Sequence, residues 1–205
     1  AGTVVLASNN AKKLAELRRV VDAAGITGLT VLGLGDVPPY PEPVENGATF
    51  DENALIKARA AVAATGLPAL ADDSGLTVEA LNGMPGVLSA RWSGGKGDQA
   101  NNDLLLAQLA DVPESRRGAA FVSVCALVGA DGEEAVARGE WHGRIVTERR
   151  GANGFGYDPL FVPDDDVAAG RTSAELTAGE KDALSHRGKA LAALIPALRS
   201  LAAAG

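Results

Sequence analysis

The feature that most constrains the fold is an uninterrupted apolar run at residues 119–128, which contains no charged side chain. A run of this length, rich in Val, Leu and Phe, is typical of a central β-strand buried on both faces. The Asp131-Gly132 dipeptide that follows is a strong turn signal, and residues 134–146 continue as a second extended segment. The chain is therefore expected to contain a long β-hairpin within a sheet.

The part of the chain before this hairpin alternates between strand and helix patterns. Residues 3–7 and 29–34 predict short strands, and Ser8-Asn9-Asn10 predicts a turn and helix cap between them. Apolar residues at helical spacing predict the helix that follows this cap and ends at Gly25; they are Leu14, Leu17, Val20, Val21 and Ala24. Alternating strands and helices followed by a hairpin indicate an α/β protein with a mixed sheet.

A second helix and a third strand follow a proline-rich loop. Thr49 with Glu52 three residues later is a capping-box pattern, which predicts a helix that runs to about Gly66. Residues 68–71 predict a strand that leads into Asp72-Asp73-Ser74-Gly75, and a further extended piece follows that acidic tetrapeptide. The acidic residues are thus expected at the end of a buried strand.

The remaining helices are predicted by the same signals. Residues 98–110 have helical apolar spacing, and a C-terminal helical region is expected to start from a cap at Thr177 or Ser185. Pro196 lacks an amide N–H, so the last helix should kink or restart there.

Composition excludes several classes of function. The 19 Lys and Arg residues against 26 Asp and Glu residues give a formal net charge of −7, which argues against binding to nucleic-acid polymers. The longest apolar stretches are far short of the roughly 18 to 20 residues of a membrane helix, so we expect no membrane association. The single cysteine allows no internal disulfide and agrees with a cytoplasmic protein. With only two histidines, a metal would be a hard cation held by oxygen ligands.

The residues from Ser8 to Lys13 form the first candidate site. Free N–H groups and the positive end of a helix dipole bind phosphate, and a lysine in the first turn adds a point charge. The alternative is a plain capped helix with solvated lysines.

The second candidate site lies in the helix predicted after Thr49. Asn53 and Lys57 share one face of this helix, and we expect that polar face to be exposed to solvent.

The Asp72-Asp73 pair is the third candidate site. Two carboxylates after an apolar strand are costly unless a cation or hydrogen-bond donors compensate them. With Mg²⁺ present, one or both could ligate the ion while the other accepts a proton from an attacking water. The alternative is a turn stabilised by its own aspartate side chains, with exposed acids.

Two further candidates lie in the last third of the chain. In the glycine-rich segment 151–161, Phe155 could present an aromatic face to a base and Asp158 could accept hydrogen bonds from it. The alternative is an ordinary turn with Phe155 in the core. Lys181, His186 and Arg187 form a patch of donors that could meet phosphate or a purine carbonyl. Cys125 lies inside the apolar run, where a thiol is inert packing, so covalent catalysis is disfavoured.

In their order and spacing these candidates resemble the inosine triphosphate pyrophosphatase family, also called the Ham1 or RdgB type, over nearly the whole chain. The resemblance is carried by seven blocks in register: Ser8-x-Asn10-x-x-Lys13, Glu45-Asn46-Gly47-x-Thr49-Phe50, Glu52-Asn53-Ala54-x-x-Lys57-Ala58, Ala71-Asp72-Asp73-Ser74-Gly75-Leu76, Gly83-x-Pro85-Gly86-x-x-Ser89-Ala90-Arg91, Gly154-Phe155-Gly156-Tyr157-Asp158-Pro159 and Lys181-x-x-x-Ser185-His186-Arg187-Gly188.

The resemblance implies an elongated mixed sheet flanked by helices, in one domain over residues 1–205 that has two lobes and a nucleotide cleft between them. It implies a homodimer that hydrolyses ITP, dITP and XTP with Mg²⁺ to the monophosphate and pyrophosphate. Such an enzyme would clear deaminated purine nucleotides from the nucleotide pool.

Site residues follow from the resemblance by position. Glu45 and Asp73 would hold Mg²⁺ with help from Asp72. Asp73 is the family's proposed proton acceptor, although Asp72 stays open as the alternative. Catalysis would also use Lys13 and Lys57. The implied substrate contacts are Ser8, Asn9, Asn10, Ala11, Lys12, Lys13, Asn53, Ser74, Phe155, Gly156, Tyr157, Asp158, Lys181, His186 and Arg187.

Two other functions are compatible with parts of this pattern. A nucleotide sensor that does not turn over its ligand would keep the phosphate-binding residues, but it has no need for several carboxylates beside a polyphosphate. A pyrophosphatase of the Maf type, which acts on modified pyrimidine nucleotides, is the other alternative. The blocks around Phe155 and His186 favour the purine enzyme.

Overall fold

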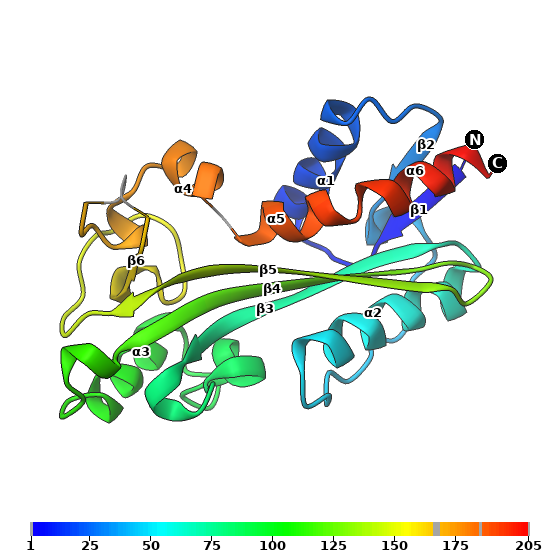
Figure 1. The fold of residues 1–205 in the computed structure, drawn as a ribbon. Helices are drawn as coiled ribbons and strands as arrows, with labels where there is room; N and C mark the ends of the chain where they lie inside the picture. Colours follow the sequence, from blue (N-terminus) through cyan, green and yellow to red (C-terminus); the bar gives the residue numbers. More distant parts are fainter. Residues whose placement is uncertain (1, 166–168, 185, 205) are drawn as a thin grey trace. The chain divides into compact units, whose positions relative to one another are not determined.

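The computed structural model describes residues 2–165, 169–184 and 186–204. These residues form one six-stranded sheet in the order β2-β1-β3-β4-β5-β6 (Figure 1). The strands are β1 (Gly2–Leu6), β2 (Leu29–Leu32), β3 (Ala69–Val78), β4 (Gly118–Val128), β5 (Glu134–Ile145) and β6 (Phe161–Pro163). β1 runs parallel to β2 and β3, whereas β5 and β6 are antiparallel. The mixed sheet of an α/β protein predicted from the sequence is thus confirmed.

β4 and β5 form the predicted hairpin. The Gly129 N–H donates to the carbonyl oxygen of Glu133 at 2.8 Å, and the Gly132 N–H donates to that of Gly129 at 3.0 Å. Gly132 has a φ of 89°, a left-handed conformation that glycine adopts without steric cost. Every residue from 119 to 128 except Phe121 is buried, as expected for a central strand.

The helices among the described residues are α1 (Ala11–Ala23), α2 (Phe50–Thr65), α3 (Asp98–Gln108), α4 (Ala178–Leu184), α5 (His186–Ala193) and α6 (Ile195–Ala203). At the start of α2, the Thr49 hydroxyl accepts the Glu52 N–H at 3.1 Å, and Gly66 ends the helix with a φ of 70°. Pro196 stands in the first turn of α6, directly after a break at Leu194. The cap at Thr49 and the helix restart at Pro196 are therefore confirmed.

One of the two predicted C-terminal caps is observed. The hydroxyl of Thr177 accepts the N–H of Glu180 at 3.2 Å at the start of α4. Ser185, the other predicted cap, lies outside the described residues.

The prediction of a strand that ends at Asp72-Asp73-Ser74-Gly75 is wrong, because β3 is continuous from Ala69 to Val78. β1 pairs with β3 only at Ala69 and Leu70 and then ends, while β4 lies along the other edge of β3. Pairing with β4 keeps the backbone extended where the local sequence favours a turn. The acidic pair therefore lies in the middle of β3, just beyond the carboxyl end of β1.

The chain divides into two compact units. Unit 1 consists of the described residues of Ala1–Asp73, Ser123–Gly139 and Arg187–Gly205, and unit 2 consists of those of Ser74–Val122 and Glu140–His186. Each unit has a hydrophobic core of its own. The prediction of a single domain with a cleft between two lobes stays a prediction.

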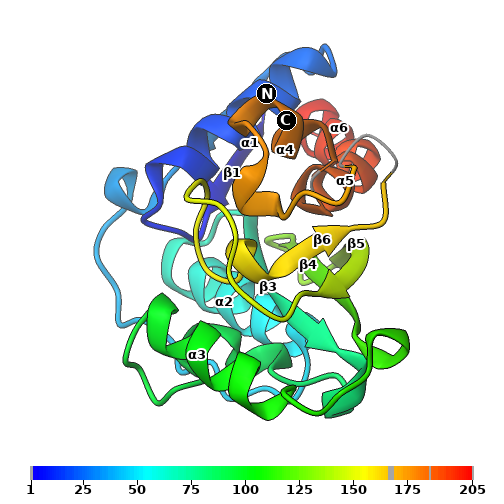
Figure 2. The same cartoon turned by 90° about the vertical axis from the view of Figure 1, so that its left-hand side faces the viewer.

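In unit 1 the two faces of the strands are covered by different helices (Figures 1 and 2). On one face, side chains from the strands pack against α1, α5 and α6; the largest members of this cluster are Leu6, Leu17, Leu70, Leu127, Leu191, Leu194 and Leu198. On the other face, Val5 and Ala69 pack with Ala61 of α2. Small alanines at this contact let α2 approach the strands closely.

The core of unit 2 is built around aromatic side chains. The Phe121 and Phe161 rings meet edge to face at 4.6 Å, and Trp141 packs beside both rings. Leu105 brings α3 onto this cluster. In the part of the chain that the structure describes, no helix has the length and apolar character needed to cross a membrane.

Candidate active site

The loop after β1 is shaped by its own side chains. The Ala7 N–H donates to the Leu70 carbonyl at 2.8 Å, and the chain then turns into α1. The Asn10 carboxamide oxygen accepts the N–H groups of Lys12 and Lys13 at 2.9 and 3.3 Å, so Asn10 is the N-cap of α1. The predicted cap is thus confirmed. The use of Ser8, Asn9, Ala11 and Lys12 as a phosphate-binding loop stays a prediction, and all four are at least partly exposed.

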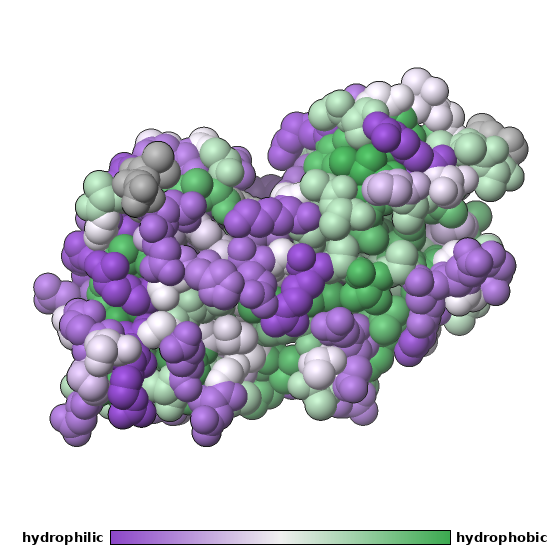
Figure 3. Space-filling model, viewed as in Figure 1, coloured by the Kyte–Doolittle hydropathy of each residue, from purple (hydrophilic) through white to green (hydrophobic). Residues whose placement is uncertain are grey.

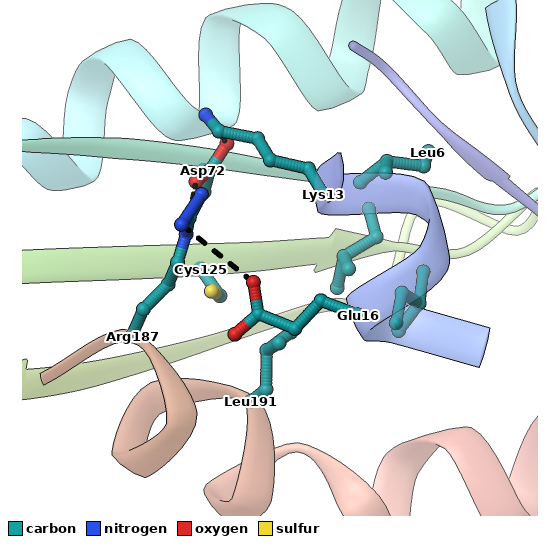
Figure 4. A pocket seen from close by; sticks show the side chains of 9 residues that line it. Leu6, Lys13, Glu16, Asp72, Cys125, Arg187 and Leu191 are labelled. Carbon is teal, nitrogen blue, oxygen red and sulfur yellow. Dashed lines mark hydrogen bonds and ion pairs between the residues drawn. The ribbon is translucent and has the colours of Figure 1, made fainter. Parts of the chain in front are cut away.

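Lys13 belongs to a cluster of ion pairs around Asp72. The Lys13 Nζ lies 2.9 Å from the Asp72 Oδ1, and the Arg187 Nε lies 4.0 Å from the Asp72 Oδ2. Arg187 also approaches Glu16, with 3.6 Å between its Nη1 and the Glu16 Oε2. Figure 4 shows Lys13 of α1 and Arg187 of α5 extending toward Asp72 on β3, while Glu16 of α1 points toward Arg187. The cluster joins three elements that are far apart in the sequence.

A cavity of about 20 Å³ lies under this cluster and is lined by Leu6, Leu70, Cys125 and Leu191, among others. Cys125 is buried, and this burial, reinforced by the negative charge of Asp72, raises the pKa of its thiol to about 12. The thiol therefore stays protonated at neutral pH, as the sequence-based interpretation of Cys125 as inert packing expects.

A larger cavity of about 390 Å³ lies beside the same end of β1. It is lined by Ala7 and Asn9 of the loop after β1, by Lys57 of α2, and by the proline-rich segment that contains Pro38, Pro39, Tyr40, Glu42 and Pro43. The Lys57 Nζ lies 3.0 Å from the Glu45 Oε1. Two predicted phosphate-binding segments, which are 48 residues apart at Asn9 and Lys57, thus border one cavity.

The prediction that Asn53 is exposed is wrong, because only 3% of this residue is accessible. The Asn53 Oδ1 accepts the N–H of Gly47 at 2.8 Å. The loop before α2 therefore covers the face that the helical pattern assigns to solvent. Hydrophobic periodicity could not reveal this, since the covering segment is polar and irregular.

The alternative of Asp72 and Asp73 as exposed acids in a turn is also wrong. Asp72 is 8% exposed, and both residues lie within β3. Successive side chains of a strand point to opposite faces. Asp72 shares its face with Leu70 and contacts α1 and α5, so Asp73 projects to the face that α2 covers.

No group of three or more acidic, histidine or cysteine side chains with metal-binding geometry occurs among the described residues. The two predicted metal ligands, Glu45 and Asp73, would each offer carboxylate oxygens to the ion. This donor set suits Mg²⁺, which is commonly bound by one or two carboxylates together with waters and substrate phosphates.

In unit 2, Phe155 is 73% exposed, so the alternative that places it in the core is wrong. The Lys181 Nζ lies 4.6 Å from the centroid of the Phe155 ring. A cation over one face of an exposed ring leaves the ring available to a flat, electron-rich ligand.

Asp158 holds the loop that carries Phe155. It is 2% exposed, and its carboxylate accepts the Phe155 N–H at 3.0 Å, the Ser173 hydroxyl at 2.8 Å and the Lys181 ammonium at 2.5 Å. Gly154 has a φ of 74°, and a Cβ there would collide with this carboxylate. The resemblance implies that Asp158 contacts the base, and this contact stays a prediction. The observed bonds show that Asp158 fixes the position of the Phe155 loop.

Gly156 is fixed by Asp98 and Asn102, which the sequence analysis did not single out, and Tyr157 is fixed by Ser89, which belongs to one of the seven blocks. The Gly156 N–H donates to the Asp98 Oδ2 at 2.8 Å, and its carbonyl accepts from the Asn102 Nδ2 at 3.1 Å. The buried Tyr157 hydroxyl donates to the Ser89 carbonyl at 2.6 Å, and burial raises its pKa. Asp98 is the first residue of α3 and Asn102 lies one turn further along it. The apolar spacing that predicted this helix gave no sign of these two contacts.

The remaining predicted residues are placed as follows. Ser74 is exposed on β3 at the start of unit 2. The His186 ring stacks on Phe121, with 5.5 Å between centroids and 12° between planes. Among the predicted site residues, unit 1 holds those from Ser8 to Lys13, Glu45, Asn53, Lys57, Asp72, Asp73 and Arg187, and unit 2 holds Ser74, those from Phe155 to Asp158, Lys181 and His186.

Taken together, the sheet and these residues define an α/β protein with lysines paired to carboxylates at the carboxyl end of a parallel strand, a place where such folds bind ligands. The chain belongs to the Ham1 family, whose sequence pattern matches residues 4–197.

Curated relatives are similar over nearly their full length. A dITP/XTP pyrophosphatase of Corynebacterium efficiens is 67% identical over 203 residues, which are 97% of this chain and 98% of the relative. One from Mycobacterium tuberculosis is 66% identical over 200 residues, which are 97% of this chain and 96% of the relative.

Solved structures agree with this assignment. The crystal structure of a nucleoside-triphosphatase / dITP/XTP pyrophosphatase from Mycobacterium abscessus has a TM-score of 0.83 at 60% identity, with coverage of 96% of this chain and 99% of the other. The Ham1 protein of Staphylococcus aureus has a TM-score of 0.86 at 38% identity, with coverage of 97% and 98%. The predicted family and fold are therefore confirmed.

Proposed function

We propose that this protein is a nucleoside triphosphate pyrophosphatase that hydrolyses dITP, XTP and ITP to the monophosphate and pyrophosphate. Its 67% identity to a dITP/XTP pyrophosphatase supports this substrate class. The structural observation that carries the proposal is that Lys13 and Lys57, from two different helices, are each paired with a carboxylate beside cavities at the end of β1.

The triphosphate binds to groups at this end of β1. The first turn of α1 offers N–H groups and the positive end of its dipole, and Lys13 adds a full charge there. Lys57 contributes from the second cavity, and Lys181 of unit 2 is a third cation for the phosphates. Ser8, Asn9, Asn10, Ala11 and Lys12 complete the phosphate contacts.

Glu45 and Asp73 are the proposed ligands of Mg²⁺, because both supply hard oxygen donors. Bound there, the ion would neutralise charge on the phosphates and lower the pKa of coordinated water. Asp72 is held by Lys13 and Arg187, so its proposed contribution is to set the position of these two cations.

In the chemical step Asp73 accepts a proton from the water that attacks the α-phosphorus. The bond between the α-phosphorus and the bridging oxygen breaks, and pyrophosphate leaves with that oxygen. Lys13 and Lys57 stabilise the negative charge that develops on the leaving group. Charge stabilisation of this kind is commonly the largest single contribution to catalysis.

Base recognition uses the groups of unit 2 together with Arg187. The exposed Phe155 ring stacks on the purine, while Gly156 and Tyr157 shape the loop around it. His186 and Arg187 donate toward the 6-oxo group that hypoxanthine and xanthine share. Adenine carries an amino group at this position, so it would leave these donors unpaired, and such mismatches discriminate strongly between substrates.

The proposal also covers the oligomeric state, the cellular location and the domain organisation of the enzyme. We infer a homodimer in the cytoplasm and a single functional domain that combines both units. In Figure 3, apolar residues gather where Figure 1 shows α5, α6 and the strands of unit 1, which suits burial against a second copy.

A comparison of substrates tests the proposal. The values of kcat/KM for ITP, dITP and XTP, measured with Mg²⁺ and a pyrophosphate-specific readout, should exceed those for ATP, GTP and modified pyrimidine nucleotides. Binding of ITP without turnover would instead identify a sensor. A preference for modified pyrimidine nucleotides would identify a Maf-type enzyme.

A further inference from the structure

The segment that carries Glu45 has little structure of its own. Residues 38–47 form no helix or strand, and within the described part of the chain their backbone groups make no hydrogen bond to other backbone groups. Four prolines, Pro38, Pro39, Pro41 and Pro43, lack N–H donors and favour an extended chain. The position of Glu45 must therefore be fixed by contacts with side chains.

Helix α2 supplies those contacts. The Asn53 Oδ1 accepts the Gly47 N–H at 2.8 Å, and the Glu52 Oε2 accepts the Ala48 N–H at 2.6 Å. Gly47 packs so closely on α2 that a Cβ there would lie 2.7 Å from the Glu52 Cβ and 2.8 Å from the Asn53 Oδ1. This close approach explains why glycine stands at position 47.

One helical turn after Asn53, Lys57 contacts Glu45 itself, with 3.0 Å between the Nζ and the Oε1. Asn53 thus fixes the backbone two residues after Glu45, while Lys57 holds the Glu45 carboxylate. Because Asn53 is 3% exposed, its bond to Gly47 is shielded from competing water. A carboxylate fixed in advance loses less freedom when a cation binds to it.

We propose that Asn53 is a positioning residue for Glu45, in place of the direct substrate contact expected from the sequence. Its carboxamide oxygen anchors the loop through Gly47, so that the Glu45 carboxylate is in place for a divalent cation. This inference rests on the proposed function, in which Glu45 is a ligand of Mg²⁺.

Two variants of Asn53 distinguish the effect of its hydrogen-bond acceptor from the effect of its side-chain volume. Asn53→Leu has a similar size but no acceptor, whereas Asn53→Asp keeps an oxygen that can accept the Gly47 N–H. The matched control is Asn101→Leu, because Asn101 is also buried and accepts a loop N–H, that of Ser93 at 2.8 Å, in unit 2. Gly47→Ala should displace the same loop while the sequence of α2 stays unchanged. It replaces Asn53→Leu as the test variant if Asn53→Leu does not fold.

Two measurements read out positioning without turnover. Hydrogen exchange of the Gly47 amide in the metal-free protein reports the anchor. Electron paramagnetic resonance of free Mn²⁺, with α,β-methylene-ITP present as an uncleavable ligand, reports cation affinity. Asn53→Leu should exchange the Gly47 amide about tenfold faster or more. It should also weaken Mn²⁺ binding by about 10- to 100-fold, as expected when the support of a metal ligand is removed.

The controls decide what the change means. Asn53→Asp should keep the wild-type protection of the Gly47 amide, and Asn101→Leu should lower thermal stability without a change in Mn²⁺ affinity. Wild-type Mn²⁺ affinity in Asn53→Leu, or in Gly47→Ala where that variant replaces it, would overturn the proposal. If the wild-type protein hydrolyses ITP but this affinity is unchanged, only the inference fails. If ITP is not hydrolysed, the proposed function fails while the anchor is still judged by exchange at Gly47.

Discussion

The Lys13 ammonium group lies 2.9 Å from the Asp72 Oδ1, and it joins the first turn of α1 to the middle of β3. The same carboxylate lies 4.0 Å from Arg187 of α5. Asp72 is therefore shared by two cations that the proposed function assigns to the nucleotide. Through these two ion pairs Asp72 links α1 and α5 to β3.

Neutralisation of Asp72 should destabilise unit 1, because Lys13 and Arg187 would then lie close together with less compensation. We expect Asp72→Asn to lower the free energy of unfolding by about 1–3 kcal/mol in urea titrations. In a Lys13→Met background the same substitution should cost less, with a coupling energy of at least about 0.5 kcal/mol. Equal losses in both backgrounds would show that the pair contributes nothing to stability.

Phe155 should matter for substrate and not for stability, since 73% of it is exposed. Phe155→Ala should change the free energy of unfolding by less than about 0.5 kcal/mol. Loss of stacking worth about 1–3 kcal/mol should lower kcat/KM for ITP by roughly 5- to 150-fold. Val136→Ala, at an apolar residue that is 41% exposed in unit 1, is the control and should leave kcat/KM unchanged. Unchanged kinetics in Phe155→Ala would remove this ring from the binding site.

The buried Cys125 thiol should make the free energy of unfolding fall as the pH rises above about 9. Burial raises the pKa of its thiol from 9.0 to about 12 in the folded protein. The stability that the buried, protonated thiol contributes is fully present below the unfolded-state pKa near pH 9. It is lost as the pH rises toward the folded-state pKa. At pH 10 the unfolded state gains about 1.4 kcal/mol from the ionised thiol.

The measurement is the free energy of unfolding of the wild type and of Cys125→Ala at pH 8 and pH 10. The wild type should lose about 1.3 kcal/mol more than the variant between the two pH values. Equal losses in the two proteins would contradict the raised pKa.

Asp73→Asn should abolish turnover and leave a folded protein that binds nucleotide. Removal of a proton acceptor typically lowers kcat by about 10²- to 10⁴-fold. Single-turnover kinetics with ITP measure this loss, and calorimetry with α,β-methylene-ITP checks that binding persists. If most of the activity remains, Asp73 is not the proton acceptor, and Asp72 becomes the group to test.

Much of the fold could be predicted from local signals in the sequence. The apolar run at residues 119–128 and the Asp131-Gly132 turn predicted the hairpin, and Thr49 and Pro196 marked helix ends, because these signals act within a few residues. The continuity of β3 could not be predicted in this way. It depends on pairing with β4, some 40 residues later, which overrides the local preference for a turn at Asp72 to Gly75.

The candidate site was predictable as a set of residue types but not as a set of contacts. The sequence pointed to Lys13, Lys57 and Asp72, but not to which carboxylate each lysine meets. Asn53 was expected on an exposed face because the pattern of a helix reports only its own side chains. The burial of Asn53 comes from the loop at Gly47, whose path is fixed by the tertiary fold.

The most direct test of the central claim is hydrolysis of ITP in water labelled with ¹⁸O, with mass spectrometry of both products. Attack of water on the α-phosphorus predicts one pyrophosphate for each inosine monophosphate, with the label only in the monophosphate. Label in the pyrophosphate, or release of orthophosphate with inosine diphosphate, would contradict the account.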